Sequence, residues 1–75
     1  MTMDIELISP ADREQLVASV LWNNDQWAEV IAEGNHLKVE LYAPPEGDAW
    51  RFDLDDAISA LTEAKRWLLE RLGAE

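Results

Sequence analysis

Turn signals divide the middle of the chain into short segments. The turns are Asn23-Asn24-Asp25, Gly34-Asn35 and the loop that begins with Pro44-Pro45. Between and beside them lie four segments rich in β-branched and aromatic residues, which favour strands: 16–22, 27–32, 37–42 and 49–53. Short turns pair neighbouring strands antiparallel. The sequence therefore predicts a four-stranded antiparallel β-meander.

Two further segments near the N-terminus are open to interpretation. Segment 3–8 alternates apolar and acidic residues and is a candidate additional edge strand. Segment 11–21 also fits a helix, because Ser9 is a suitable cap and Pro10 suits the first helical position. The pairing of strands described below favours a strand in the second half of this segment.

The last third of the chain has the spacing of an amphipathic helix. Asp53 is the expected N-cap and Gly73 the expected stop. Apolar residues recur three and four positions apart, which aligns them on one helical face: Leu54, Ala57, Ile58, Leu61, Ala64, Leu68 and Leu72. We therefore expect an α+β fold in which one helix, about 54–72, packs on one face of a sheet covering about 14–53.

Pairing the strands through their turns sorts the side chains into two faces, because alternate residues of a strand point to opposite sides. A turn at residues 24–25 places Trp22 opposite Trp27, and a turn at 34–35 pairs the next two strands. The face that results is almost entirely apolar and is expected to pack on the helix: Val17, Ser19, Leu21, Ala28, Val30, Ala32, Leu37, Val39, Leu41, Trp50 and Phe52.

The other face of the predicted sheet, turned away from the helix, is partly polar but also carries large apolar residues. In this register Trp22, Trp27 and Tyr42 cluster at one end of it. Exposed apolar area usually marks an interface, in which Trp and Tyr are frequent anchors. The predicted interface residues on this face are Trp22, Trp27, Tyr42, Val20, Ile31, Glu29 and Glu40.

Composition narrows the classes of partner. The 75 residues include 16 Asp or Glu against 6 Lys or Arg, a formal charge of −10. This charge opposes binding to nucleic-acid phosphates and favours a basic protein. The chain has no cysteine, which excludes disulfides and thiol chemistry and suits a reducing cytoplasm. No apolar run approaches the length of a membrane span. We expect one cytoplasmic domain, 1–75, with no membrane contact.

Groups able to carry catalysis are scarce. His36 is the only histidine, and Ser9, Ser19 and Ser59 have no base nearby in the sequence. The acidic run 53–56 lacks the central glycine and the distal glutamate of a calcium loop, and helix capping explains it. The sequence therefore predicts no enzyme, no cofactor and no metal site.

Three runs of the sequence resemble known proteins. They are Trp27-Ala28-Glu29-Val30 through Glu33-Gly34, then 37–42, and then 50–58, which reads Trp-Arg-Phe-Asp-Leu-Asp-Asp-Ala-Ile. Over residues 13–72 the chain resembles a group of small bacterial proteins and, in outline, the immunity proteins encoded beside bacterial polymorphic toxins. The helix is also similar to one that follows a small sheet in some antitoxins. The resemblance implies a bacterial binding protein and carries over no site residue.

These observations predict a non-enzymatic protein-binding module, of immunity or antitoxin type, that neutralises a basic partner. A chain of this size buries only about 60% of its unfolded surface, so a partner is expected. One alternative is a small structural homodimer joined through the outer sheet face. In another, residues 1–12 fold over that face as a second small core. A third is a small ligand bound at the aromatic cluster.

Overall fold

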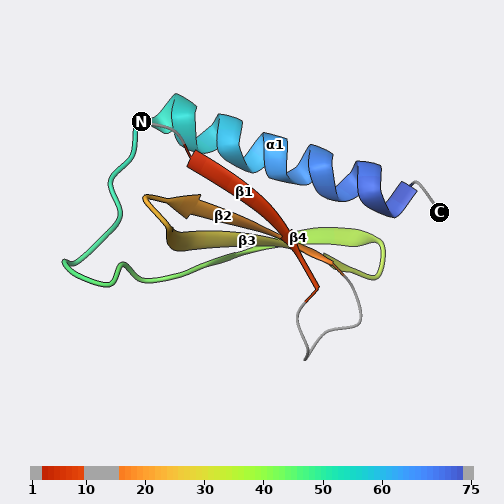
Figure 1. The fold of residues 1–75 in the computed structure, drawn as a ribbon, viewed down its shortest axis with the longest axis horizontal. Helices are drawn as coiled ribbons and strands as arrows, with labels where there is room; N and C mark the ends of the chain where they lie inside the picture. The colour runs from red at the N-terminus through yellow and green to blue at the C-terminus, as the bar shows by residue number, and fades with distance from the viewer. Residues whose placement is uncertain (1–2, 10–15, 74–75) are drawn as a thin grey trace.

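The computed structural model describes residues 3–9 and 16–73, which form a four-stranded antiparallel sheet and one helix (Figure 1). The elements are β1 (Met3–Ile8), β2 (Val17–Trp22), β3 (Asp25–Glu33), β4 (His36–Leu41) and α1 (Leu54–Gly73). The strands lie side by side in chain order, and α1 packs on one face, mainly against β1 and β2. The predicted α+β fold, an antiparallel meander followed by one C-terminal helix, is confirmed.

Two-residue turns join the last three strands. Asn23 and Asn24 have positive φ angles of 52° and 69°, as both central residues of a type I′ hairpin turn require. Asparagine is one of the few residues other than glycine that adopts this conformation readily. Gly34, with φ at 59°, begins the turn between β3 and β4. The hairpin of β2 and β3 thus turns at residues 23–24, one residue earlier than the turn at 24–25 expected from the sequence.

A β-bulge follows this first turn. Leu21 pairs with Gln26, but its neighbour Val20 pairs with Ala28, so Trp27 is an extra residue on β3. The shifted turn and the bulge together change the register between β2 and β3. The expected pairing of Trp22 with Trp27 is wrong, because Trp22 lies opposite Asp25.

The changed register reverses the two faces of β2. Ala18 and Val20 belong to the buried cluster beneath α1. The prediction that Val17, Ser19 and Leu21 face the helix is therefore wrong, because adjacent residues of a strand point to opposite sides. A shift of one residue is enough to exchange every side chain of a strand between the two faces.

Small side chains let α1 approach the sheet closely. The buried cluster includes Ala60 and Ala64 on the helix and Ala18 and Ala28 on the sheet, with Leu68 fully enclosed. Alanine has no side-chain atoms beyond Cβ, so the helix axis can lie near the sheet while the core stays filled.

The helix begins as predicted, and charged side chains pair along its exposed side. Asp53 Oδ2 accepts a hydrogen bond from Asp56 N at 3.3 Å, which caps the first turn. Arg66 pairs with Glu63 and, at 3.1 Å, with Glu70. Hydrogen bonds from Arg66 and Trp67 lower the pKa of Glu63. These exposed pairs contribute little stability, so burial of the apolar face is the main reason that α1 forms.

Residues 42–53 connect β4 to α1 without forming a strand, so the strand predicted over 49–53 is wrong. Trp50 and Phe52 in this connection instead pack their rings together, with centroids 5.5 Å apart. Both are partly buried against the core cluster. Residues 49–53 are thus held at the end of the sheet by burial of their aromatic rings, and not by the strand pairing that the sequence predicted.

The N-terminal alternatives are partly settled. Segment 3–8 forms β1, which pairs antiparallel with β2 at the edge of the sheet. Residues 3–8 therefore extend the sheet and do not fold across its outer face. Residues 1–2 and 10–12 of the proposed covering segment lie outside the described residues. The alternative helix over 11–21 is wrong for residues 17–21, which lie in β2, and residues 11–15 lie outside the described residues.

Candidate protein-interaction surfaces

A row of directly opposed residues crosses the face of the sheet that is turned away from α1, which we call the outer face. Glu6 on β1 lies opposite Ser19 on β2, Ser19 lies opposite Glu29 on β3, and Glu29 lies opposite Glu40 on β4. We call these four residues the acidic row. Like charges directly opposite one another are unfavourable in a sheet. The pair Glu29 and Glu40 therefore needs compensating interactions.

Tyr42 and Gln26 provide some of these interactions. The Tyr42 hydroxyl lies 3.2 Å from Oε1 of Glu29 and 3.1 Å from Oε1 of Glu40, and its single proton is donated to one carboxylate at a time. Gln26 Nε2 donates to Ser19 Oγ at 2.6 Å and to Glu29 Oε2 at 3.1 Å. Glu29 is only 9% exposed. Its carboxylate is thus held in a fixed position by its neighbours.

These surroundings also change the acidity of Tyr42. Burial, followed by the hydrogen bond to Glu40 and the negative charge of Glu29, raises the pKa of Tyr42 to about 12. The pKa of an unfolded tyrosine is about 10. A group whose folded pKa is raised stabilises the fold fully below its unfolded pKa. The contribution of Tyr42 is therefore present below pH 10 and decreases as the pH rises towards 12.

We expect a titration of the tyrosine absorbance to show this shift. Tyr42 is the only tyrosine of the chain, so the tyrosinate signal reports on one group. The native protein should titrate near pH 12, whereas the protein in denaturant should titrate near pH 10. Glu40→Gln should lower the native midpoint, because it removes a carboxylate that disfavours the phenolate. Circular dichroism recorded in parallel identifies the folded range, and a folded protein with a midpoint near 10 would contradict the geometry.

The structure separates the predicted interface residues into two groups. Glu29, Ile31, Glu40 and Tyr42 lie on the outer face, where Glu29 and Ile31 are buried. Val20, Trp22 and Trp27 lie on the other side of the sheet, in or against the core beneath α1.

The predicted cluster of Trp22, Trp27 and Tyr42 therefore does not form. The two tryptophan rings instead pack around Phe52, with centroid distances of 5.5 Å and 4.8 Å. Trp50 Nε1 donates to the Tyr42 carbonyl oxygen at 2.9 Å, which holds the connection against the end of β4. Among the described residues, the buried Trp27 Nε1 has no hydrogen-bond partner. The bulge at Trp27 is the physical reason for the difference, since it turns this side chain into the core.

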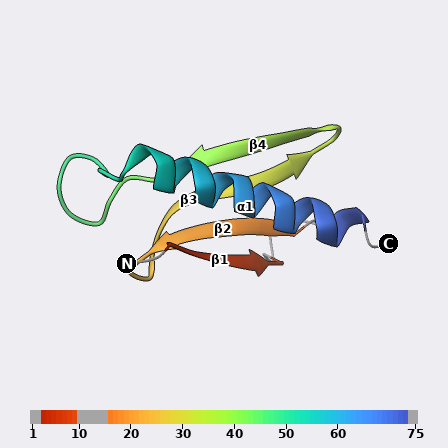
Figure 2. The same cartoon turned by 90° about the horizontal axis from the view of Figure 1, so that it is seen from above.

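A second surface lies between β4 and α1 on the helix side of the sheet. Seen from above, the helix crosses the sheet obliquely, and β4 lies at the edge of the sheet beside it (Figure 2). Four large apolar side chains of β4 and α1 are exposed, and we call them the apolar strip: Val39 (49% exposed), Leu41 (69%), Leu54 (71%) and Ile58 (51%). Such a surface on a small chain is a candidate interface.

The prediction placed Val39 and Leu41 in the core, so this second surface was missed. A signal for it existed in the helix. Leu54 and Ile58 are four residues apart and lie on the flank of the alanine stripe that contains Ala60 and Ala64. An apolar stripe wide enough to include both sets exceeds what the contact with a small sheet buries.

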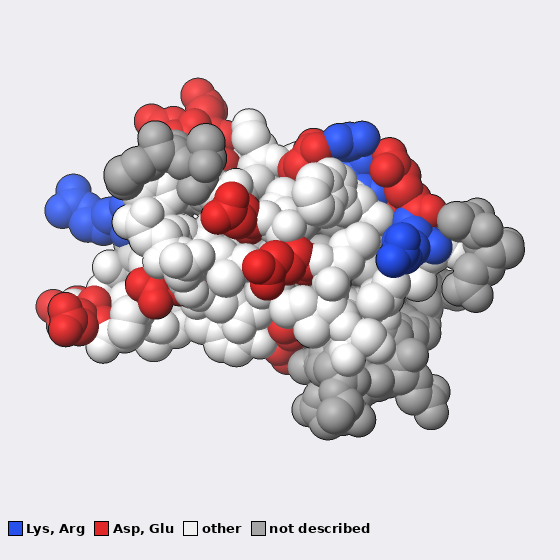
Figure 3. Space-filling view, viewed as in Figure 1, with Lys and Arg blue, Asp and Glu red and all other residues white. Residues whose placement is uncertain are grey.

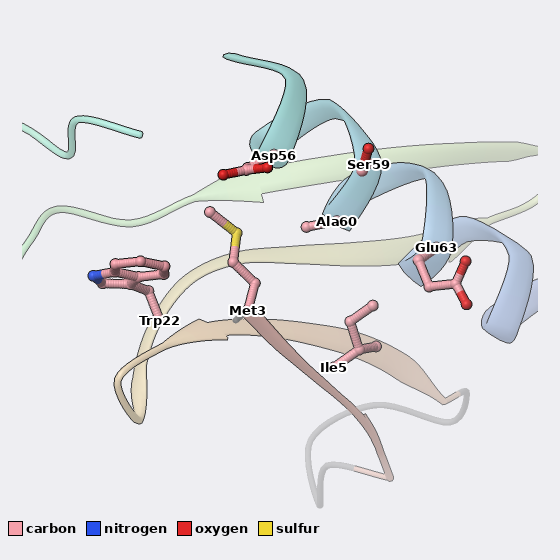
Figure 4. A pocket seen from close by; sticks show the side chains of 7 residues that line it. All are labelled: Met3, Ile5, Trp22, Asp56, Ser59, Ala60 and Glu63. Carbon is pink, nitrogen blue, oxygen red and sulfur yellow. The ribbon is translucent and has the colours of Figure 1, made fainter. Parts of the chain in front are cut away.

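A shallow groove runs between β1 and α1. Uncharged side chains occupy the middle of this side of the molecule, with acidic side chains scattered across it and basic ones gathered towards its ends (Figure 3). Met3, Ile5 and Trp22 form the apolar floor, and Asp56 and Glu63 of the helix flank it (Figure 4). The lining also includes Ser59 and Ala60, and no histidine is among the residues that line the groove.

Within residues 3–9 and 16–73, no three histidine or acidic side chains gather closely enough to hold a metal ion. The one helix described is too polar to cross a bilayer.

Comparisons of the chain with protein-family models, with curated proteins and with solved structures find no significant match. The two candidate surfaces therefore rest on their geometry and chemistry.

Proposed function

We propose that the chain is a non-enzymatic protein-binding module, of immunity or antitoxin type, which neutralises a basic partner through its outer face. The observation that carries this proposal is the acidic row. Glu6 on β1, Glu29 on β3 and Glu40 on β4 are aligned in one row with Ser19 on β2, although the directly opposed carboxylates of Glu29 and Glu40 weaken a sheet. Local arrangements that oppose stability are most often found at functional sites.

The row is suited to receive lysine or arginine side chains. Tyr42 and Gln26 already orient Glu29, so binding requires little ordering of the acidic side. A guanidinium or ammonium group placed beside Glu6 or Glu40, the exposed carboxylates of the row, would form charge-assisted hydrogen bonds. The formal charge of −10 would accelerate the encounter with a basic protein.

The acidic row also bears on the homodimer joined through the outer face. A symmetric contact of this kind would bring the acidic rows of both copies together, at a large electrostatic penalty. The outer face is therefore better suited to a basic partner than to a second copy.

The proposal is tested by affinity purification from the source organism with two matched variants. Glu6→Gln/Glu40→Gln removes two exposed carboxylates of the row, and Glu46→Gln/Asp48→Asn removes two exposed carboxylates of the 42–53 connection. Both variants have the same net charge. We expect the first to lower recovery of a basic protein about tenfold or more, and the second to leave it nearly unchanged.

Two results would count against this function. Equal loss with both variants would mean that bulk charge alone drives the binding. Recovery of no basic protein by the wild-type chain at low salt would remove the reason to assign a basic partner.

A further inference from the structure

The exposed edge of β4 has its backbone groups arranged to accept another strand. Tyr42 N donates to Trp27 O at 3.0 Å, so the backbone groups of residue 42 point towards β3. Backbone groups alternate in direction along an antiparallel strand, so those of Lys38 and Glu40 also point towards β3. The residues of β4 whose backbone N–H and C=O groups point away from β3, in the plane of the sheet, are therefore Leu37, Val39 and Leu41. No described segment lies beyond this edge (Figure 2).

The charges on β4 are complementary to those of a second β4. Two copies related by a twofold axis pair antiparallel, and a register centred on Val39 places Lys38 of each copy opposite Glu40 of the other. Opposite charges in this position stabilise a strand pair. Registers centred on Lys38 or on Glu40 would instead place like charges opposite each other.

Lys38 can make this contact without losing its present partner. Lys38 Nζ pairs with Glu33 Oε1 at 3.1 Å and has three donors. Glu40 receives the Tyr42 hydroxyl on one oxygen and has several acceptor positions. The contact between two copies therefore adds to the existing interactions of β4.

The same register continues the apolar strip across the contact. On the helix side, Val39 meets its own copy and Leu41 meets Leu37 of the other copy. Val39 is 49% exposed and Leu41 69% exposed in the single chain. Their burial would remove apolar area from water, which favours association.

The other free edge of the sheet is protected against such pairing. Asp4 and Glu6 of β1 both lie on the outer face. Twofold registers centred on Asp4, Ile5 or Glu6 each place carboxylates opposite carboxylates. Charged residues of one sign are a common means of preventing edge-to-edge association. The two edges therefore differ, and only β4 is complementary to itself.

We propose that the protein forms a symmetric dimer in which the β4 strands pair antiparallel, centred on Val39, with both helices on the same side of the joined sheet. The partner at this edge is a second copy of the chain. The inference goes beyond the basic partner proposed above and does not depend on it: Glu40 contributes to both surfaces, but self-association is measured on the purified chain alone.

A charge exchange tests the register. Sedimentation at protein concentrations between about 1 and 500 µM should detect a dimer of the wild-type chain. This range covers the dissociation constants expected for a small interface. Lys38→Glu should raise the dissociation constant of the dimer about tenfold or more. The reason is that it places a glutamate opposite Glu40 at both symmetry-related positions of the strand pair. The double variant Lys38→Glu/Glu40→Lys should restore it to within about threefold, since the exchanged charges are again opposite. Arg51→Glu makes the same charge change away from β4 and should have little effect.

Amide hydrogen exchange supplies a second readout that does not require a variant. As the dimer forms, exchange should slow at the amides of Leu37, Val39 and Leu41, whereas Lys38 and Glu40 are already protected by β3. A chain that stays monomeric to about 500 µM, or a dimer unaffected by Lys38→Glu, would overturn the proposal. A dimer that meets these tests stands even if no basic partner is found, and a monomer overturns it even if one is.

Discussion

Replacing Val20 with asparagine should remove most of the stability of the fold. Val20 is fully buried beneath α1, so the change loses apolar burial and places an amide where nothing pairs with it. The two effects together amount to about 3–5 kcal/mol. A chain of this length has about 4–11 kcal/mol in total. Urea unfolding followed by tryptophan fluorescence measures the loss, and the midpoint should fall sharply.

The same substitution at the neighbouring residue is the matched control. Leu21 is only partly buried and lies on the outer face, opposite Gln26. Leu21→Asn should therefore cost only about 1–2 kcal/mol. If Leu21→Asn lowered the free energy of unfolding more than Val20→Asn, the result would support the register expected from the sequence and contradict the bulge at Trp27.

Replacing Leu68 with alanine should have the second large effect. Among the described residues, Leu68 is the largest fully buried side chain, and it lies between α1 and the sheet. Its truncation leaves a cavity that a helix already held close by alanines cannot fill, at a cost of about 3–4 kcal/mol. In a domain of this size the melting temperature should fall by about 15–25 °C.

Leu69 provides the comparison on the same helix. It is 46% exposed, so Leu69→Ala should cost less than about 1 kcal/mol. Thermal unfolding of both variants is compared by circular dichroism at the same protein concentration, because self-association would raise the apparent stability. Equal melting temperatures for the two variants would mean that Leu68 does not face the sheet.

Local patterns were sufficient for the elements whose signals are contained within one segment. The helix follows from its apolar spacing, the cap at Asp53 and the stop at Gly73, and the structure has it over Leu54–Gly73. The hairpin at Gly34 was also predicted with its register, because a glycine with positive φ marks the turn clearly. The strand predicted over 49–53 failed, because Trp50 and Phe52 are buried equally well by packing on other aromatic rings.

The candidate interface was predicted only in part, and one ambiguous turn explains why. Within Asn23-Asn24-Asp25, a turn at either adjacent pair is compatible with the sequence. The choice of pair sets the facing of β2, and the bulge at Trp27 has no separate signal. Tyr42, Glu29 and Glu40 were placed on the outer face because their register depends on Gly34. Trp22 and Val20 were placed there wrongly because theirs depends on the first turn.

Patterns within single segments were enough to predict the C-terminal helix, the strands β2 to β4 and the acidic charge, because apolar spacing, turn residues and charge are properties of neighbouring positions. Which residues form a surface depends on the tertiary structure. The close packing of α1 on β1 and β2 left Val39 and Leu41 of β4 uncovered, and the register across three strand pairs aligned Glu6, Glu29 and Glu40. Both outcomes depend on contacts between residues far apart in the chain, which no local pattern encodes.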